Sequence, residues 1–360
     1  MIGTMGMWIE DWNTVFNNFR NSLSTYDRIC VLGNVEAEPN KLGGLTINFE
    51  KFLRLCEAYG RDIEIMTGAH KDDEHLYTFP TSTNKVNVVY WPTFWLSLTL
   101  VRLVNGQPYI QNSKNNFNIH NWNTGLDYSP LYTFISMNGV PKVHRCILQD
   151  LLVKHDILKH GKFSWRNIRN EGHWYNFQHW KEEQTFLDQS DPNNLYHQEV
   201  VPEVFKNCLI QIVPETHEDR FFLTEKTAIP LFFNKPFIVA GSKGYHKKLQ
   251  QLGFQLYDEI FDYSFDDVDD INVRYEMIVE TVKPLVSLSY NQKVDMYKRL
   301  FDKCVYNKKL ALRYALDTES FPSIWKELAT KQYEELIHVN PYHFNNILEN
   351  HKNAFEFSKL

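Results

Sequence analysis

The chain has 360 residues and a net charge of −6, with 43% hydrophobic and 23% charged residues. This composition excludes a disordered protein, and the length suits two domains of roughly 150 to 200 residues each. The five cysteines lack disulfide or zinc spacing, and the first residues lack the basic start of a secretory signal. We therefore expect a protein of the cytoplasm, that of the host if the gene is viral.

The charge is unevenly distributed along the chain. Residues 76–169 contain ten basic and three acidic side chains, so the remainder of the chain is strongly acidic. A basic segment in an acidic protein is typical of a surface that meets an anion, such as a nucleotide phosphate, a nucleic acid or an acidic glycan. A solvated surface without a partner is the alternative.

The first half of the chain alternates apolar strands with helices. Residues 28–33, 62–66, 86–91 and 131–137 are predicted strands, and residues 49–59 and 142–158 are predicted helices. The apolar run 86–104 approaches the length of a membrane span. Because Pro92 and Arg102 interrupt this run, we expect a buried strand followed by a helix, and no membrane insertion.

The second half repeats the alternation and then becomes helical. Residues 208–213 and 236–240 are predicted strands, and helices are expected near 203, from 224, over 245–252 and from 269 onward, with interruptions at Pro284 and Pro322. Such alternation predicts parallel sheets covered on both faces. We expect an α/β protein with two Rossmann-like lobes, a cleft between them and a C-terminal helical region, divided into residues 1–185, 186–280 and 281–360.

A candidate anion site lies between the two strands of the second half. Glu215 ends the first of these strands, and Thr224, Glu225, Lys226 and Thr227 open the next helix. Thr224 can cap that helix, whose free N–H groups attract phosphate, and Lys226 adds a positive charge. The carboxylate of Glu225 or Glu215 can accept hydrogen bonds from ribose hydroxyls. These residues predict a nucleoside diphosphate site; a capped helix with solvated charges is the alternative.

Residues 196–274 resemble the donor-binding half of GT-B glycosyltransferases, most closely the fucosyltransferase-like group. The shared pattern is a strand that ends in Glu215, a short loop, and an aromatic residue shortly before Thr-Glu-Lys at 224–226. Residues 252–266 are similar to bacteriophage glycosyltransferases. The resemblance implies inverting transfer from a nucleotide sugar without a cofactor or required metal, with Glu225 toward the ribose and Lys226 toward the diphosphate. Residues 227–230 depart from the fucosyltransferase pattern, so the donor, a UDP- or GDP-sugar, stays open.

The first half offers a second element of the donor site. Residues 134–145 form a predicted strand, a turn at Asn138 and a basic helix start that contains Arg145. N–H groups and a guanidinium at such a point can bind a phosphate, and Arg145 can neutralise the leaving diphosphate. A surface arginine in the first turn of a helix is the alternative. The three ranges then become an acceptor-side domain (1–185), a nucleotide-sugar domain (186–280) and helices that pack on both lobes (281–360).

An inverting transferase needs a general base to deprotonate the attacking hydroxyl. Glu36 follows the strand at 28–33 and is the first candidate, with Asp72 second, because the carboxyl edge of a parallel sheet is where such a base belongs. Trp91 and Trp95 are expected to contact the acceptor. The acidic run at 266–270 contains a spacing that manganese enzymes use, but no apolar strand precedes it. We therefore interpret it as a solvated turn and predict no metal site.

The acceptor is the least determined part of the prediction. The basic segment and the phage resemblance favour a hydroxymethylated pyrimidine in duplex DNA, which requires phosphate contacts and a pocket for a flipped base. The sequence pI of about 6.2 weighs against DNA, and a polysaccharide or other glycan hydroxyl is the alternative. A non-catalytic nucleotide- or glycan-binding protein on the same scaffold is the third possibility.

Overall fold

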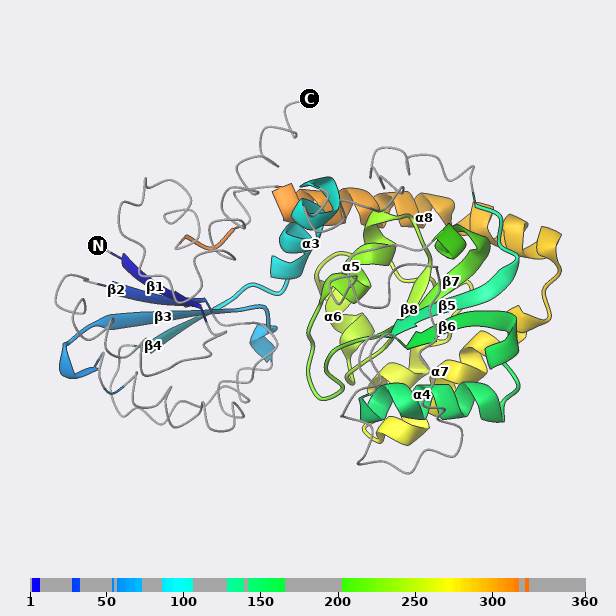
Figure 1. Ribbon diagram of the computed structural model, residues 1–360, viewed down its shortest axis with the longest axis horizontal. Coiled ribbons are helices and arrows are strands. Elements are labelled where there is room, and N and C mark those ends of the chain that lie inside the picture. The colour runs from blue at the N-terminus through cyan, green and yellow to red at the C-terminus, as the bar shows by residue number, and fades with distance from the viewer. Residues whose placement is uncertain are drawn as a thin grey trace. The chain divides into compact units, whose positions relative to one another are not determined.

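The computed structural model describes residues 2–6, 28–32, 54, 57–72, 86–105, 128–138, 142–165, 203–316 and 321–323 (Figure 1). Contacts divide the chain into two compact units, one of Met1–Ser97 with Leu316–Leu360 and the other of Leu98–Ala315. The described strands form one four-stranded parallel sheet in each unit. The chain is thus an α/β protein with parallel sheets, as predicted, whereas the two-lobed arrangement with a cleft stays a prediction.

The sheet of the first unit has its strands in sequence order. It contains β1 (Ile2–Gly6), β2 (Arg28–Leu32), β3 (Asp62–Thr67) and β4 (Val86–Tyr90), in the order β1-β2-β3-β4. Three apolar side chains of β3 are buried (Ile63, Ile65 and Met66). The apolar run after residue 86 forms β4 and then the 12-residue helix α3 (Phe94–Asn105), as predicted. No helix in the described ranges has the length and apolar character that crossing a bilayer requires.

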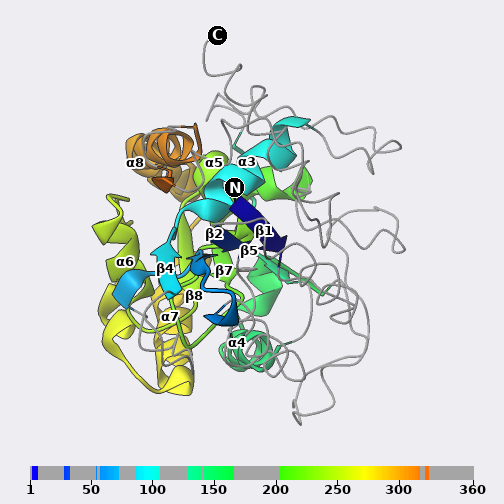
Figure 2. The ribbon, with the colours of Figure 1, turned by 90° about the vertical axis from the view of Figure 1, so that its left-hand side faces the viewer.

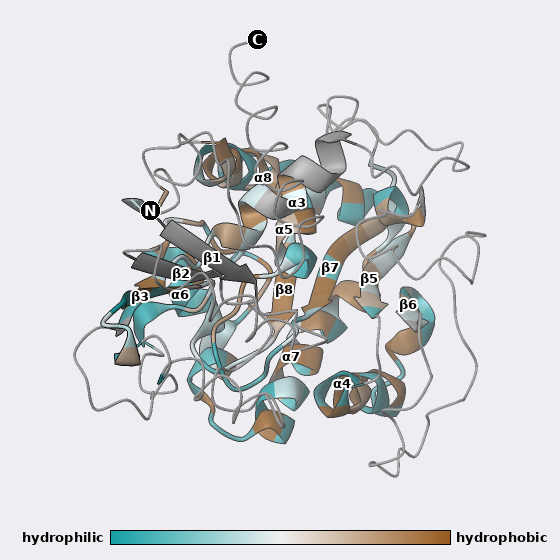
Figure 3. Ribbon diagram, turned by 60° about the vertical axis from the view of Figure 1, so that its left-hand side comes forward, coloured by the Kyte–Doolittle hydropathy of each residue, from teal (hydrophilic) through white to brown (hydrophobic). Residues whose placement is uncertain are grey.

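The sheet of the second unit has its strands out of sequence order. It contains β5 (Tyr132–Asn138), β6 (Gly161–Trp165), β7 (Cys208–Pro214) and β8 (Phe237–Ala240), in the order β6-β5-β7-β8. Every side chain of β7 and β8 is buried, and Figure 3 shows both strands as strongly hydrophobic. A parallel strand whose two faces are both covered by helices has a nearly continuous apolar sequence. These two strands could therefore be predicted from the sequence.

Helices cover both faces of this second sheet. The helices are α4 (Val143–Lys154), α5 (Glu225–Phe232), α6 (Tyr245–Gln251), α7 (Ile271–Val286) and α8 (Tyr290–Leu316), joined by short 3₁₀ turns at Leu158–His160, Glu203–Asn207 and Tyr263–Asp267. Figures 1 and 2 show α4 and α7 on one face and α5 and α8 on the other. Helix α7 contains Pro284 in its last turn and ends at Val286, two residues after the predicted interruption.

The strand pairing differs from the predicted division at residue 185. Strand β5 pairs with β7 through Tyr132 opposite Cys208 and Phe134 opposite Ile210, so residues 132–165 belong to the same sheet as residues 208–240. Alternating strands and helices show that sheets exist but do not show which sheet each strand joins, so they do not locate the boundary between domains. The predicted boundary at residue 185 lies outside the described residues.

The sequence analysis did not predict β1 or β6. Strand β6 is short, and it begins at Gly161, whose Cα faces the buried ring of Phe134 on β5. A Cβ atom at position 161 would overlap that ring, so a glycine is required for the two strands to pair at this point. The glycine that permits the pairing also weakens the strand signal in the sequence.

A buried lysine lies at the amino ends of the strands of this sheet, beside the first residue of β7. Lys235 is fully buried, and its ammonium donates hydrogen bonds to the carbonyl oxygens of Phe205, at 2.7 Å, and Cys208. The ammonium also lies 3.9 Å from the centre of the Tyr128 ring. Burial lowers the pKa of Lys235 to about 7, because the protein interior disfavours the charged form.

A histidine closes the outer side of β8. The backbone N–H of Val239 points away from β7 and donates to His246 Nε2 at 3.0 Å. The ring therefore accepts at Nε2 and carries its proton on Nδ1, which lies 2.9 Å from Asp266 Oδ1. His246 and Asp266 are both 2% exposed in their side chains, so this pair is part of the core.

Candidate active site

The second sheet contains a topological switch point between β5 and β7. The chain leaves β5 through α4 toward β6 on one side, and leaves β7 through α5 toward β8 on the other. The loops after β5 and β7 therefore diverge at the carboxyl edge of the sheet, and open α/β sheets bind ligands at such a point. The predicted donor residues lie in these two loops and at the first turns of α4 and α5, namely Asn138, Arg145, Glu215, Thr224, Glu225, Lys226 and Thr227.

Glu215, at the end of β7, organises the loop that leads to α5. Its Oε2 accepts hydrogen bonds from Thr216 N at 2.9 Å and Thr224 Oγ1 at 2.7 Å. Its Oε1 accepts from Thr227 Oγ1 at 2.6 Å, Thr224 N at 3.1 Å and Tyr245 Oη at 3.3 Å. The side chain is completely buried. Both carboxylate oxygens are therefore engaged inside the protein, and Glu215 and Thr227 support the loop rather than present groups to a ribose.

The first turn of α5 combines a helix cap with a lysine. Thr224 is the N-cap residue, and its hydroxyl accepts from Lys226 N at 3.2 Å. Lys226 Nζ donates to Thr216 Oγ1 at 3.0 Å and to Glu225 Oε1 at 2.6 Å. The Glu225 side chain is 3% exposed and that of Lys226 is 16% exposed. The lysine is thus held over the loop that Glu215 organises, next to the positive end of the helix dipole.

The first turn of α4 meets the same loop from the other side of the switch point. His144 Nε2 donates to Glu215 O at 2.8 Å, and Arg145 Nη2 lies 3.5 Å from the same oxygen. Lys142 Nζ donates to Thr216 O at 3.3 Å. Since a carbonyl oxygen only accepts, these contacts direct three basic side chains of one helix toward the end of β7.

His144 is buried and borders an exposed acid. Its side chain is 2% exposed, whereas that of Glu218, 3.3 Å from His144 Nδ1, is 44% exposed. Burial is the main cause that lowers the pKa of His144, and the positive charge of Arg145 acts in the same direction. The neighbouring imidazole lowers the pKa of Glu218, so this carboxylate is ionised at neutral pH.

Arg274, in the first turn of α7, joins the loops after β7 and β8. Its guanidinium donates to Gly241 O at 3.2 Å, Glu218 O at 3.3 Å and Val268 O at 2.7 Å. The residue is almost fully buried. The sequence analysis assigned it no role, because a single arginine at a helix start has no distinctive spacing; nor did it predict Tyr245, which reaches Glu215 from α6.

The turn at 241–244 contains two glycines before a helix, as some phosphate-binding turns do, but here a side chain of the protein binds the N–H groups that follow it. Asp266 Oδ1 accepts from His246 N at 3.2 Å, and its Oδ2 accepts from Lys247 N at 3.0 Å. A carboxylate of the protein thus binds the first N–H groups of α6, so this helix start does not offer them to a phosphate. Asp267 and Asp269 in the same acidic run pair with Lys247 and Lys243 at the surface, whereas Asp266 is buried, so the predicted solvated turn is confirmed for only part of the run.

Asn138 lies at the end of β5 beside the switch point, whereas the two predicted tryptophans belong to the first unit. Asn138 ends β5, is 2% exposed, and donates from Nδ2 to Ser136 Oγ at 3.3 Å. In the first unit, Trp91 and Trp95 are 3% and 8% exposed, and both rings contact Phe94. Both tryptophans are therefore packed like core side chains. Contact of either tryptophan with an acceptor stays a prediction.

Of the two candidates for the general base, the structure describes only Asp72. Glu36 lies outside the described residues. Asp72 is exposed, and its carboxylate lies 3.3 Å from His70 Nδ1. The described residues thus give the donor side of the prediction a detailed geometry and leave the base as a prediction.

The comparisons with known proteins give little further guidance. The chain matches no protein-family model, and no curated protein matches it. Among solved structures, the crystal structure of an alpha1,3-fucosyltransferase is similar over 89% of this chain and 92% of that chain, with 11% identity and a TM-score of 0.35. A likeness of that size carries no conclusion about function, which must therefore be argued from the residues of the switch point.

Proposed function

We propose that the chain is a nucleotide-sugar-dependent glycosyltransferase that binds its donor at the switch point between β5 and β7. The observation that carries the proposal is the meeting of two helix starts and three basic side chains at one loop. Lys142 and Arg145 of α4 and Lys226 of α5 all contact the segment Glu215–Thr216. Helix starts and basic side chains in this arrangement favour a diphosphate.

Each residue then has a defined part in donor binding. Lys226 and Arg145 neutralise the diphosphate, which is the leaving group, and Glu225 binds the ribose hydroxyls. Glu215, Thr224 and Thr227 keep the loop and the first turn of α5 in the shape that the diphosphate needs. A donor of this kind, a UDP- or GDP-sugar, needs no metal in the proposed inverting reaction if these cations replace it.

Lys226 provides the sharpest test of the donor site. Lys226→Ala should weaken binding of UDP or GDP by at least about tenfold, since it removes a charge-assisted hydrogen bond. Binding of the uncharged nucleoside should change little. Lys298→Ala, in an exposed position of α8, is the matched control. Calorimetric titration of both variants distinguishes the outcomes, and equal diphosphate affinity in Lys226→Ala and wild type would remove the lysine from the site.

Transfer is tested separately from binding. Under the proposal, Glu36→Ala abolishes sugar transfer and leaves the donor affinity unchanged, because a general base acts on the acceptor. If nucleotide sugars bind but neither transfer nor hydrolysis occurs, the non-catalytic alternative replaces the enzyme. If no nucleotide sugar raises the melting temperature, the donor site itself is wrong.

We further propose hydroxymethylated pyrimidine in duplex DNA as the acceptor, supported by the basic residues of segment 76–169. Duplex binding should then weaken steeply as the salt concentration rises. A flat salt response, together with transfer to a polysaccharide, would favour the glycan hydroxyl instead.

A further inference from the structure

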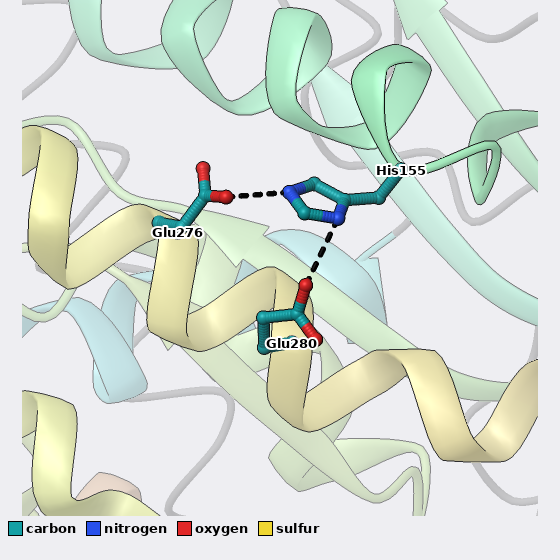
Figure 4. A group of neighbouring side chains, drawn as sticks. All are labelled: His155, Glu276 and Glu280. Atoms are coloured by element: carbon teal, nitrogen blue, oxygen red, sulfur yellow. Dashed lines mark hydrogen bonds and ion pairs between the residues drawn. The ribbon is translucent and has the colours of Figure 1, made fainter.

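A histidine and two glutamates form a compact group outside the donor site. His155 Nε2 lies 2.6 Å from Glu276 Oε1, and His155 Nδ1 lies 2.9 Å from Glu280 Oε1 (Figure 4). One ligand atom from each of the three residues lies within 4.8 Å of the other two. We propose that this group binds a divalent transition metal of the zinc class and thereby fastens α4 to α7.

The three side chains come from two helices that pack against each other. Glu276 and Glu280 are four residues apart on α7, so both project from one face of that helix. His155 is the C-cap residue of α4, and α4 packs on α7. The negative end of the α4 dipole therefore points at the group and favours a cation there. Ligands on regular helices keep their positions better than ligands on loops.

The donor set selects the kind of metal. An imidazole nitrogen suits zinc and neighbouring transition metals, whereas magnesium and calcium prefer a shell made only of oxygen atoms. The side chains of His155, Glu276 and Glu280 are 13%, 32% and 46% exposed, so the metal can enter from solvent and complete its shell with water. Glu280, the most exposed, must rotate to bring its carboxylate to the same ring nitrogen as Glu276.

Two lysines compete with the metal for these carboxylates. Lys154 Nζ lies 2.9 Å from Glu276 Oε1, and Lys283 Nζ lies 3.0 Å from Glu280 Oε1. Their side chains are 61% and 51% exposed, and ion pairs with such exposure contribute little to stability. A metal can displace both ammonium groups into solvent. If the group is a metal site, removing the two lysines should strengthen metal binding. A group that only forms ion pairs would show no such effect.

A metal at this position would affect the two helices that it joins, α4 and α7. His155 and Arg145 lie at opposite ends of α4, about 15 Å apart along the helix axis. Helix α7 carries Arg274, which bonds the loops after β7 and β8. A metal between the far end of α4 and the middle of α7 would thus fix the spacing of two helices whose first turns border the switch point.

Zinc binding tests the site directly, without any donor or acceptor. Chelator-treated full-length protein is titrated with zinc chloride in a calorimeter, and the melting temperature is measured with and without zinc. Zinc should bind and raise the melting temperature of the wild type. His155→Ala and Glu280→Gln should each weaken this binding by at least about tenfold. His160→Ala, a nearby histidine outside the group, should behave as wild type and controls for zinc held by other histidines.

The two lysines separate a metal site from a set of ion pairs. Lys154→Met with Lys283→Met should increase the zinc affinity severalfold, because both carboxylates lose a competing cation. Cobalt in place of zinc should give visible ligand-field bands that disappear in His155→Ala. Equal zinc binding in the wild type, His155→Ala and the double lysine variant would overturn the proposal and leave an ion-pair cluster between α4 and α7.

Discussion

The Glu215 carboxylate accepts hydrogen bonds at both oxygens from two backbone N–H groups and three hydroxyls. Because all five partners donate, both oxygen atoms of the side chain at position 215 must be acceptors. The sequence analysis placed Glu215 at the site and named it, beside Glu225, as one of two possible ribose ligands. A strand that ends in glutamate does not reveal whether the carboxylate turns outward to a ligand or inward to the following loop.

Replacing one oxygen of this carboxylate with an amide tests that role. Glu215→Gln should lower the free energy of unfolding by about 2 to 3 kcal/mol, because the new NH₂ group faces donors and leaves buried groups without an acceptor. Urea denaturation measures the change.

Glu259→Gln is the matched control for this substitution. Glu259 is half exposed and pairs with Lys303 at the surface, so its loss should change stability by less than about 0.5 kcal/mol. Equal stability losses in the two variants would contradict the supporting role of Glu215.

At the scale of elements, Gly161 and Phe134 set the fit between β6 and β5. Gly161→Ala should destabilise the protein by about 1 to 3 kcal/mol, because the new Cβ overlaps a fully buried ring. Phe134→Leu introduced together with Gly161→Ala should recover part of that loss, since the smaller side chain makes room. Thermal unfolding of the single and double variants measures both effects. A destabilisation that is strictly additive would show that the two positions do not interact.

The same elements show how far the sequence predicts the fold and the site. Strands such as β7 are continuous apolar runs and were predicted within a residue or two, as were α6 and the starts of α4 and α5, whereas the predicted end of α4 lay four residues too late. Strand β6 was missed because it carries a glycine, a lysine and a serine among its five residues. The membership of β5 in the second sheet was missed because pairing between distant strands leaves no local pattern. The Thr-Glu-Lys turn was named from its spacing together with the family resemblance, and its part in donor binding stays a prediction, whereas the partners of Glu215 required the structure.

At the scale of the whole molecule, buried titratable groups predict the pH dependence of stability. The pKa of Lys235 is lowered to about 7, so between pH 7 and its ordinary value the folded protein binds fewer protons than the unfolded chain. The free energy of unfolding therefore rises with pH in this window. Burial raises the pKa of the Cys208 thiol to about 11 and those of Cys146 and Cys304 to about 12, so these thiols remove stability above about pH 9.

Stability should therefore rise from pH 7, pass through a maximum and fall above about pH 9. Lys235 contributes on the order of 1 to 2 kcal/mol of the rise between pH 7 and 8.5. Urea denaturation under reducing conditions, repeated across this range, measures the profile. Lys235→Met should flatten the rise and leave the decline above pH 9 unchanged. The same rise in that variant would assign it to other groups.

The bond between Val239 and His246 occupies an N–H group on the outer side of β8. Strand β8 is the last strand in the described order, and an edge strand with a free N–H group is a template for strands of other molecules. The imidazole occupies that group from within the chain, and the Asp266 carboxylate keeps the ring oriented. At this position of β8 the edge therefore offers no free N–H group to a strand of another molecule, because a side chain of the following helix already accepts from it.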